Sequence, residues 1–420
     1  MSSAEKLPPW RYRLLLAALS PLLMLHALWR SFKDGGRIYL QQRLGFNLPK
    51  INDGALWVHA ASVGEVQTAT PLIQALGEQY PDTQFLLTTT TPTGYSTLLR
   101  LHADHAYVAY LPIDFVTSIR RFYKHLNPTA GIIIETEIWP NLYHLSPVPI
   151  AIVNGRLSSR TLRAAQSWGH TVYKQTLQIP ELIATRSDTD TTGFISIGAS
   201  SLSTRTVGNL KFANAADASE ALLPLCERPY CLLASTHDDE ELQLTRVWFQ
   251  QRRSELLVIA PRHPERRSAI LRQLRPLLQG SDQRIAVRSQ NDPIDKNTVI
   301  YLADTFGELP NWYAHARAVF IGGSLIERGG HNMLEAAAVG KAVVCGPHTF
   351  NFSEEVAALR QHAAMLTGAT ATECIQNLIR LLDDPDKSHE MGLVARSLLD
   401  MHRDIADRYV ENLKPVLRHL

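Results

Sequence analysis

The chain has 420 residues, of which 45% are hydrophobic, and a formal net charge of +2. This length exceeds what one hydrophobic core usually supports, so we expect two domains of about 150–200 residues each. The near balance of charge argues against a nucleic-acid-binding protein that relies on a broad basic face. The four cysteines lack the spacing of a structural zinc site and no H-E-x-x-H motif occurs, so the sequence predicts no metal site and no cofactor.

The first predicted element is a membrane-anchor segment at residues 1–34. Residues 14–29 carry almost no charge, and four cations flank them: Arg11, Arg13, Arg30 and Lys33. The apolar stretch is slightly shorter than the ~20 residues of a spanning helix and contains Pro21, so an interfacial helix and a full span both fit. The cations suit lipid headgroups on the cytoplasmic side of a membrane. A buried first helix is the alternative.

Short apolar runs alternate with longer amphipathic stretches over residues 35–212, the first predicted domain. Such alternation is typical of parallel strands buried on both faces by crossover helices. The expected strands are residues 56–60, 84–88, 106–112, 131–135, 149–153 and 181–186.

A stretch rich in small residues at 213–228 is the predicted linker, and the same alternation restarts in a second domain at 229–400. The expected strands there are residues 230–235, 255–261, 298–304, 318–323 and 342–347. A C-terminal helix at 401–420 would be free to pack back on the first domain. The sequence therefore predicts an α/β protein of two doubly wound, Rossmann-like domains that face each other across a cleft, with ligands beyond the carboxyl ends of the strands.

Three carboxylates in the first domain follow predicted strands. Gly64 permits a tight turn that leaves Glu65 at the start of a helix, where the helix dipole favours the ionised form of a general base. A carboxylate that only caps its own helix is the alternative. Glu135 and Glu137 lie at the end of the strand 131–135, and because alternate strand residues face opposite ways, we expect only one of them to face the cleft.

The second domain contains the glycine-rich segment FIGGSLIERGGHNMLE at 320–335. Its pattern predicts a strand, a turn and a helix beginning near Asn332, which together could hold a phosphate, with Glu335 placed to accept ribose hydroxyls. The alternative is an ordinary glycine-rich turn. Arg262 suits a phosphate or carboxylate, and Lys211, near the domain junction, is a mobile point charge.

Ten segments together resemble the bacterial lipid A Kdo transferases, which add the acidic sugar Kdo (3-deoxy-D-manno-octulosonic acid) to the lipid A precursor. In chain order they are HAASVGE, TTTTPTG, ETEIWPNL, NGRLSSR, GNLKF, ASTHDDEE, APRHPER, DTFGEL, GGSLIERGGHNMLE and GPHTFNF. The resemblance implies the GT-B architecture, with an acceptor site in the N-terminal domain and a donor site in the C-terminal domain.

Residue roles follow from this resemblance. It implies that Glu65 is the proton acceptor and that Glu135 and Lys211 support the transition state. The residues it implies for CMP are Pro261, Arg262, Phe306, Gly307, Glu308, Asn332, Met333, Leu334 and Glu335. The implied reaction is an inverting, metal-independent transfer of Kdo from CMP-Kdo to lipid IVA in lipopolysaccharide biosynthesis, at the cytoplasmic face of the inner membrane of a Gram-negative bacterium.

A set of cations and one departure from the family's usual sequence concern the acceptor side. The cations would favour an anionic membrane surface and a phosphorylated lipid, or would form an ordinary solvated face: Arg30, Lys33, Arg37, Arg43 and Lys50. Gly155 stands where the family often has Ala, next to Arg156, and bears on acceptor preference. The competing functions are another GT-B nucleotide-sugar transferase or epimerase, and a non-catalytic membrane-tethered binding protein.

Overall fold

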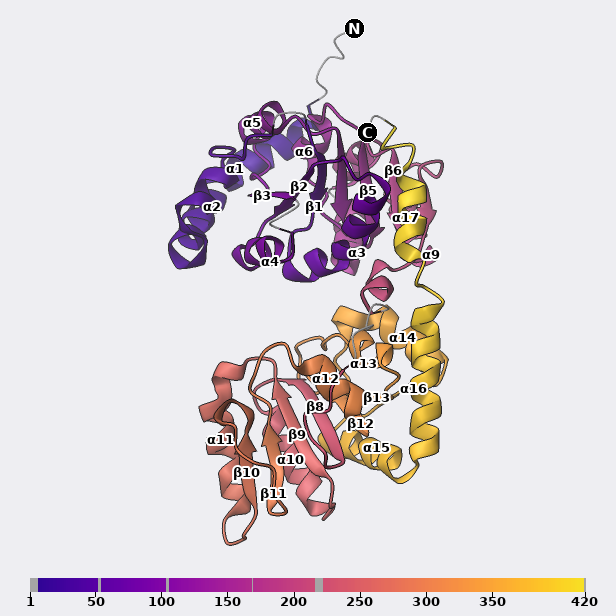
Figure 1. The fold of residues 1–420 in the computed structure, drawn as a ribbon. Coiled ribbons are helices and arrows are strands. Elements are labelled where there is room, and N and C mark those ends of the chain that lie inside the picture. The colour runs from indigo at the N-terminus through magenta and orange to yellow at the C-terminus, as the bar shows by residue number, and fades with distance from the viewer. Residues whose placement is uncertain (1–6, 52–53, 103–105, 168, 216–221, 419–420) are drawn as a thin grey trace. The chain divides into compact units, whose positions relative to one another are not determined.

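The computed structural model describes residues 7–51, 54–102, 106–167, 169–215 and 222–418. It divides into two compact units, unit 1 (Met1–Asn214 with Asp404–Leu420) and unit 2 (Ala215–Arg403) (Figure 1). Each unit contains a seven-stranded sheet in which the strand pairings are parallel, so the expected α/β fold class with two doubly wound sheets is confirmed. Of the predicted end segments and linker, residues 1–6, 216–221 and 419–420 lie outside the described residues.

The sheet of unit 1 has the order β3-β2-β1-β4-β5-β6-β7. Its strands are β1 (Leu56–His59), β2 (Phe85–Thr89), β3 (Ala106–Tyr110), β4 (Ala130–Ile134), β5 (Ile150–Gly155), β6 (Leu182–Thr185) and β7 (Thr204–Thr206). The strand order reverses between β1 and β4, and a doubly wound sheet binds its ligands beyond the carboxyl ends of the strands at such a point.

Helices cover both faces of this sheet. They are α3 (Val63–Gln79), α4 (Pro92–His102), α5 (Val116–Leu126), α6 (Pro140–His144), α7 (Ser159–Gln166), α8 (His170–Thr176) and α9 (Asp188–Ser196), followed by the 3₁₀ helix η2 (Leu210–Ala215). The apolar residues of α3 recur at helical spacing and are buried against the sheet: Val66, Ala69, Leu72, Ile73 and Leu76.

The last helix, α17 (Ile405–Leu413), belongs to unit 1 although it follows unit 2 in the chain. Ile405, Tyr409 and Leu413 are spaced four residues apart and join the same core as α3. The Tyr409 hydroxyl donates a hydrogen bond of 2.7 Å to the Gly208 carbonyl oxygen. Figure 1 shows this yellow helix beside the indigo and purple elements of unit 1.

The N-terminal apolar segment is part of a helical stretch of 34 residues, from Trp10 to Arg43, that is long and apolar enough to cross a membrane by length and composition. It consists of α1 (Trp10–Arg30), a π-helical turn η1 (Ser31–Gly35) and α2 (Gly36–Arg43). Pro21 does not end α1. A proline has no N–H, so Pro21 cannot make the usual helical hydrogen bond to the Ala17 carbonyl oxygen, and the Ser20 hydroxyl donates to that oxygen instead.

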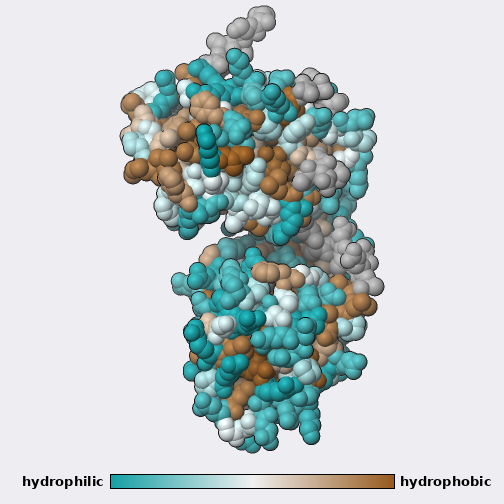
Figure 2. Space-filling view, turned by 60° about the vertical axis from the view of Figure 1, so that its left-hand side comes forward, coloured by the Kyte–Doolittle hydropathy of each residue, from teal (hydrophilic) through white to brown (hydrophobic). Residues whose placement is uncertain are grey.

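One face of α1 is open to solvent, so the alternative of a buried first helix is wrong. Leu14, Leu22 and Leu25 are each more than 60% exposed. Figure 2, turned so that the left side of Figure 1 comes forward, shows hydrophobic residues (brown) gathered on unit 1. At the other face, Ala27 and Tyr39 pack with Tyr110 in a small core that joins this helical stretch to unit 1.

The sheet of unit 2 has the order β10-β11-β9-β8-β12-β13-β14, with its reversal between β8 and β12. Its strands are β8 (Tyr230–Thr236), β9 (Leu256–Pro261), β10 (Arg284–Val287), β11 (Thr298–Leu302), β12 (Ala318–Ile321), β13 (Val343–Cys345) and β14 (Met365–Thr367). Its helices are α10 (Glu240–Gln250), α11 (Arg267–Leu274), α12 (Leu309–His315), α13 (Leu334–Ala338), α14 (Ser353–Gln361), α15 (Ala371–Asp383) and α16 (Pro385–Asp400), with short 3₁₀ helices η3 (Pro264–Arg266), η4 (Arg275–Leu278), η5 (Arg288–Gln290) and η6 (Phe350–Phe352).

Three strands were not expected from the sequence: β7, β10 and β14. All three lie at sheet edges and each is only partly buried. The expected strands were found as continuous apolar runs, a pattern that arises only where a strand is covered on both faces. An edge strand of three or four residues lacks that pattern.

Candidate active site

In unit 1, Glu65 lies in the first turn of α3, immediately beyond β1. Its carboxylate accepts hydrogen bonds from the Ala61 backbone N–H (2.8 Å) and the Ser62 hydroxyl (3.2 Å). Ser62 is the N-cap residue and accepts from the Glu65 N–H in return. This is close to a capping box, so Glu65 has the helix-capping role weighed as an alternative, in addition to any chemical one.

The charge state of Glu65 differs from the expectation. Burial, followed by the charges of Glu135 and Glu137, raises the pKa of Glu65 from 4.5 to about 8. The hydrogen bonds from Ala61 and Ser62 lower this pKa and are outweighed. A helix dipole is worth ~0.3–1 kcal/mol, less than one pKa unit, so it cannot keep this carboxylate ionised at neutral pH. The prediction of an ionised Glu65 is therefore wrong at pH 7.

Glu135 follows β4 in the left-handed backbone region, with φ of 61°. Few residues other than glycine adopt this conformation, and such positions concentrate at functional sites. The Glu135 N–H donates a 2.9 Å hydrogen bond to the Val153 carbonyl oxygen, which holds the turn against β5. The strand ends at Ile134, and the charges of both Glu135 and Glu137 act on Glu65. That only one of the two faces a ligand stays a prediction.

Glu137 is held in its ionised form by its neighbours. The Trp139 indole N–H donates to its carboxylate at 2.6 Å, and the His59 Nε2 atom lies 3.8 Å from it. Burial raises the pKa of Glu137, but His59, Trp139 and Arg43 together lower it below its ordinary value. A carboxylate that stays charged this close to Glu65 helps to keep Glu65 protonated.

Arg43 and His59 are site residues that the sequence reasoning missed. Arg43 was counted among the cations for a membrane surface, which is wrong: burial lowers the pKa of its guanidinium group, which donates to the Leu111 carbonyl oxygen and interacts with Glu137. His59 is fully buried, and its Nδ1 atom contacts the Thr88 hydroxyl at 2.9 Å. The available signal was the position of His59 at the carboxyl end of β1.

Lys211 lies in η2, whose start is tied to the carboxyl end of β5. The Leu210 N–H donates to the Asn154 side-chain oxygen at 3.0 Å, and the Lys211 N–H donates to the Asn209 side-chain oxygen at 3.1 Å. Because Val153, the neighbour of Asn154, bonds Glu135, the backbone of Lys211 is held close to the same sheet edge as the carboxylates.

In unit 2, the candidate donor residues follow β9, β11 and β12, which with β8 are neighbours in the sheet. Gly322 brings the chain after β12 against the end of β8, because a Cβ atom at this position would clash with the Ser235 carbonyl oxygen. Helix α13 begins at Leu334, two residues later than expected, and has only five residues. The helix expected near Asn332 is therefore shorter and later, and the Leu334 N–H is taken by the Asn332 side-chain oxygen at 3.1 Å.

A cluster of histidines and arginines forms where these loops meet. His237, after β8, stacks on His331, with ring centroids 4.9 Å apart and their Nε2 atoms 2.7 Å apart. His263 lies 5.6 Å from His237, centroid to centroid. Among the described residues, neither Arg262 nor Arg328 has a carboxylate within ion-pair distance.

Both stacked histidines are neutral at pH 7. Burial lowers the pKa of His331 to about 4, helped by His237, Arg262 and His263. Burial also lowers the pKa of His237 to about 4, with the charges of His263, Arg328, Arg266 and Arg262. So many positive groups around buried imidazoles make a site suited to a phosphate or carboxylate. His237 and His331 were not among the predicted site residues, although both follow a strand end.

Glu335 and Arg262, both assigned to CMP, lie close enough for the charge of Arg262 to act on the Glu335 carboxyl group. Glu335 is solvent-accessible yet surrounded by protein, and burial raises the pKa of its carboxyl group against the opposing effects of Asn332 and Arg262. The Asn332 amide donates to the Glu335 carboxylate at 3.2 Å. Pro261, Met333 and Leu334 are buried, so only their backbone groups are placed to meet a ligand.

Glu308 is already engaged by protein groups. Arg288 binds its carboxylate with three hydrogen bonds of 2.7–3.2 Å, and this arginine lowers the pKa of Glu308. Phe306 is 77% exposed, and Gly307 has a positive φ of 84°. The assignment of residues 306–308 to CMP stays a prediction, and the groups open to a ligand there are the Gly307 backbone and the Phe306 ring. In the described part of the chain no group of three or more His, Cys, Asp or Glu side chains is arranged to hold a metal ion.

Comparisons with known proteins identify the family of this chain. The model of the 3-deoxy-D-manno-octulosonic-acid transferase (kdotransferase) family matches residues 39–214. The 3-deoxy-D-manno-octulosonic acid transferase of Haemophilus influenzae is 33% identical over 97% of this chain and 99% of its own length. The chain belongs to the 3-deoxy-D-manno-octulosonic acid transferase family. The resemblance seen in the sequence is confirmed, and with it the activity of a glycosyltransferase that transfers Kdo.

Solved structures of more distant proteins share the architecture of this Kdo transferase. A glycosyltransferase from Rickettsia africae is 11% identical over 88% of this chain and all of its own, with a TM-score of 0.57. The UDP-GlcNAc 2-epimerase from Neisseria meningitidis is 13% identical over 86% of this chain and 99% of its own, with a TM-score of 0.56. At these identities the likeness concerns the fold alone, and the fold is that of GT-B glycosyltransferases.

Proposed function

We propose that this Kdo transferase moves Kdo from CMP-Kdo to a sugar hydroxyl of the lipid A precursor lipid IVA, with inversion at the anomeric carbon and Glu65 as general base. The observation that carries the proposal is the buried carboxyl of Glu65 at the strand-order reversal of unit 1, its pKa raised to about 8 beside two further carboxylates. General bases are most effective when their pKa lies near the working pH.

Glu65 would accept the proton as the hydroxyl oxygen attacks the anomeric carbon and the bond to the CMP phosphate breaks. At pH 7 only about a tenth of Glu65 would be ionised, but that fraction is more basic than an ordinary carboxylate. Protonation of Glu65 during the step relieves its repulsion from Glu135 and Glu137, which favours the transfer of the proton. Glu135 and Lys211 are proposed to support the positively charged sugar ring and the developing phosphate charge, respectively.

Unit 2 is proposed to hold the donor. Arg262 would bind the CMP phosphate or the Kdo carboxylate, and the neutral imidazoles of His237 and His331 would add N–H donors in a site with strong positive potential. Glu335 would accept ribose hydroxyls, and residues 306–308 would meet the base.

The N-terminal helical stretch is proposed to hold the enzyme at the inner membrane, on the cytoplasmic side. Its exposed leucines and flanking cations suit the boundary between acyl chains and anionic headgroups. An acceptor that carries acyl chains resides in the membrane while a nucleotide sugar is water-soluble, so a tethered enzyme reaches both.

Mass spectrometry tests the proposed donor and acceptor together. The full chain is incubated with CMP-Kdo and a lipid A precursor, and we expect a mass gain in whole Kdo units that depends on both substrates. CMP release without a heavier lipid would contradict the proposed acceptor. The number of mass units would also count the sugars added.

A further inference from the structure

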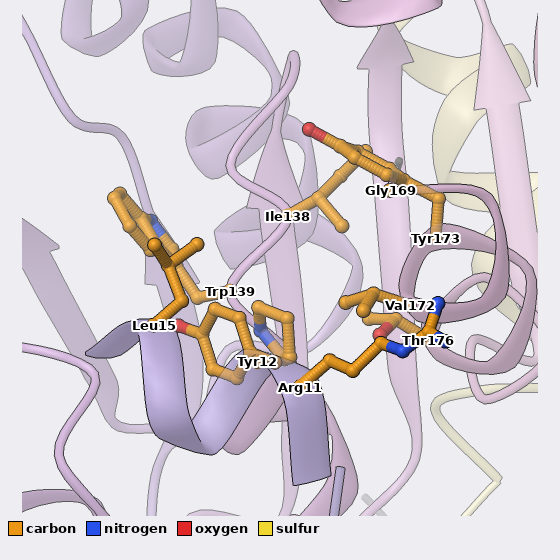
Figure 3. A pocket seen from close by; sticks show the side chains of 10 residues that line it. Arg11, Tyr12, Leu15, Ile138, Trp139, Gly169, Val172, Tyr173 and Thr176 are labelled. Carbon is orange, nitrogen blue, oxygen red and sulfur yellow. The ribbon is translucent and has the colours of Figure 1, made fainter. Parts of the chain in front are cut away.

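A cavity of about 530 Å³ lies in unit 1 between three elements: α1, α8 and the turn that follows β4. This volume is within the ~300–1,000 Å³ range of small-molecule pockets. Its walls are mainly apolar and include Tyr12, Leu15, Ile138, Trp139, Val172 and Tyr173. Figure 3 shows the side chains of α1 and α8 on opposite sides of this space.

The wall formed by α1 is fixed to the loop between β3 and α5. The Tyr12 hydroxyl donates a 2.6 Å hydrogen bond to the Asp114 carboxylate. The same carboxylate accepts the N–H groups of Asn141 (2.9 Å) and Leu142 (2.8 Å) at the start of α6. Asp114 is buried, so these bonds hold α1 in one position and the cavity is a built feature of unit 1.

The cavity continues into the exposed apolar face of α1. Leu15 lines the cavity and is itself 39% exposed, and Leu19, one helical turn later, is 40% exposed. Arg11 lies at the rim, and in Figure 3 its side chain extends toward Val172 and Thr176. An apolar space that opens onto an apolar face beside an exposed cation suits a hydrocarbon chain attached to an anionic headgroup.

One residue of the cavity wall, Trp139, contacts the carboxylate of Glu137. Its indole N–H is the group that binds Glu137 at 2.6 Å. Glu137 in turn acts on Glu65 through its charge. A chain in this cavity would therefore be separated by the Trp139 side chain from Glu137, whose charge acts on Glu65, and in this position the acceptor and not bulk lipid is expected.

From these contacts we infer that the cavity binds one acyl chain of the lipid acceptor and that Trp139 is a positioning residue linking the bound chain to Glu137. The inference rests on the proposed function and deepens it, because it locates the recognition of the acceptor's tail. Binding there would hold the sugar hydroxyl near Glu65 while the other chains stay in the membrane.

The test fills the cavity and leaves the carboxylates unchanged. Val172→Trp places an indole in the cavity, whereas Thr171→Trp adds the same bulk to an exposed neighbour on α8 that does not line it. Transfer is measured with a lipid A precursor that has full-length acyl chains and with a synthetic counterpart that has short chains. We expect Val172→Trp to lower kcat/KM about 30-fold for the long-chain acceptor and less than threefold for the short-chain one, with no change in Thr171→Trp. A 30-fold loss corresponds to about 2 kcal/mol, or two to three buried CH₂ groups.

Calorimetry without CMP-Kdo gives a second readout, the affinity for the long-chain acceptor. An unchanged affinity and kcat/KM in Val172→Trp would overturn the inference. An equal loss with both acceptors, together with weaker flotation on phospholipid vesicles, would also overturn it, because the cavity would then hold membrane lipid. Binding that depends on Val172 without any transfer would support the cavity and contradict the proposed reaction, and an enzyme that binds neither acceptor would overturn both.

Discussion

Unit 1 and unit 2 build their candidate sites at the same place in the fold and give them opposite electrostatic character. In each, the candidate site includes residues beyond the carboxyl ends of the two strands where the order reverses, β1 and β4 in unit 1 and β8 and β12 in unit 2. Burial and like charges act on both sites. In unit 1 they raise the pKa of Glu65 to about 8, and in unit 2 they lower the pKa values of His237 and His331 to about 4. The same arrangement of backbone thus gathers acidic side chains in unit 1, where the proton acceptor is proposed, and basic ones in unit 2, where the anion site is proposed.

The largest expected effect is a loss of turnover without a loss of CMP affinity when the proposed base in unit 1 is replaced. Glu65→Gln should lower kcat about 10²–10⁴-fold, the usual loss of a general base, while CMP affinity by calorimetry stays unchanged. Glu78→Gln, an exposed carboxylate at the far end of α3, is the matched control. If Glu65→Gln turns over within threefold of the unaltered chain, Glu65 is not the base.

The reverse pattern is expected in unit 2. Arg262→Ala should weaken CMP binding about 10–100-fold, since a charge-assisted hydrogen bond contributes ~1.5–3 kcal/mol. Arg272→Ala, an exposed arginine of α11, should leave the affinity unchanged. An Arg262→Ala variant with full CMP affinity would remove this residue from the donor site.

The pH dependence of kcat/KM tests the raised pKa of Glu65 and the effect of Glu135 on it. Because Glu65 must lose its proton to act, kcat/KM should rise about tenfold per pH unit below pH 8 and level off above it. Glu135→Gln removes one of the charges that raise this pKa, so its profile should shift to lower pH even if its maximal rate falls. A Glu135→Gln profile with an unmoved midpoint would show that Glu135 does not act on Glu65 through its charge.

A smaller effect is expected on stability. A carboxyl whose pKa is raised by folding binds its proton more tightly in the folded state, so its contribution is full below pH 4.5 and is lost as pH rises to about 8. Glu65→Gln cannot ionise, so its melting temperature should exceed that of the unaltered chain more at pH 8.5 than at pH 5. Each kcal/mol corresponds to about 2–4 °C for a domain of this size. An identical difference at both pH values would contradict the raised pKa.

The fold was predictable where strands are buried on both faces and at the edge strand β3, whereas the other three edge strands were not predicted. The strands next to the order reversals, β1, β4, β8 and β12, appear in the sequence as continuous apolar runs. The edge strands β7, β10 and β14 are short and partly exposed, so their residues carry no such pattern. Helix α13 began later than its glycine-rich approach indicated, because Asn332 and Met333 belong to the turn.

The sequence by itself determined two parallel sheets, an apolar N-terminal segment and a set of charged residues at strand ends, because apolar runs and glycine turns are local features of the chain. Tertiary structure alone decided which charges meet. Arg43 and His59 come from different elements to hold Glu137, and His237 and His331 stack although they are far apart in the chain. It also decided the protonation state of Glu65, because a pKa depends on the sum of burial and neighbouring charge around a group, and that sum exists only once β1, β4 and α2 are packed together.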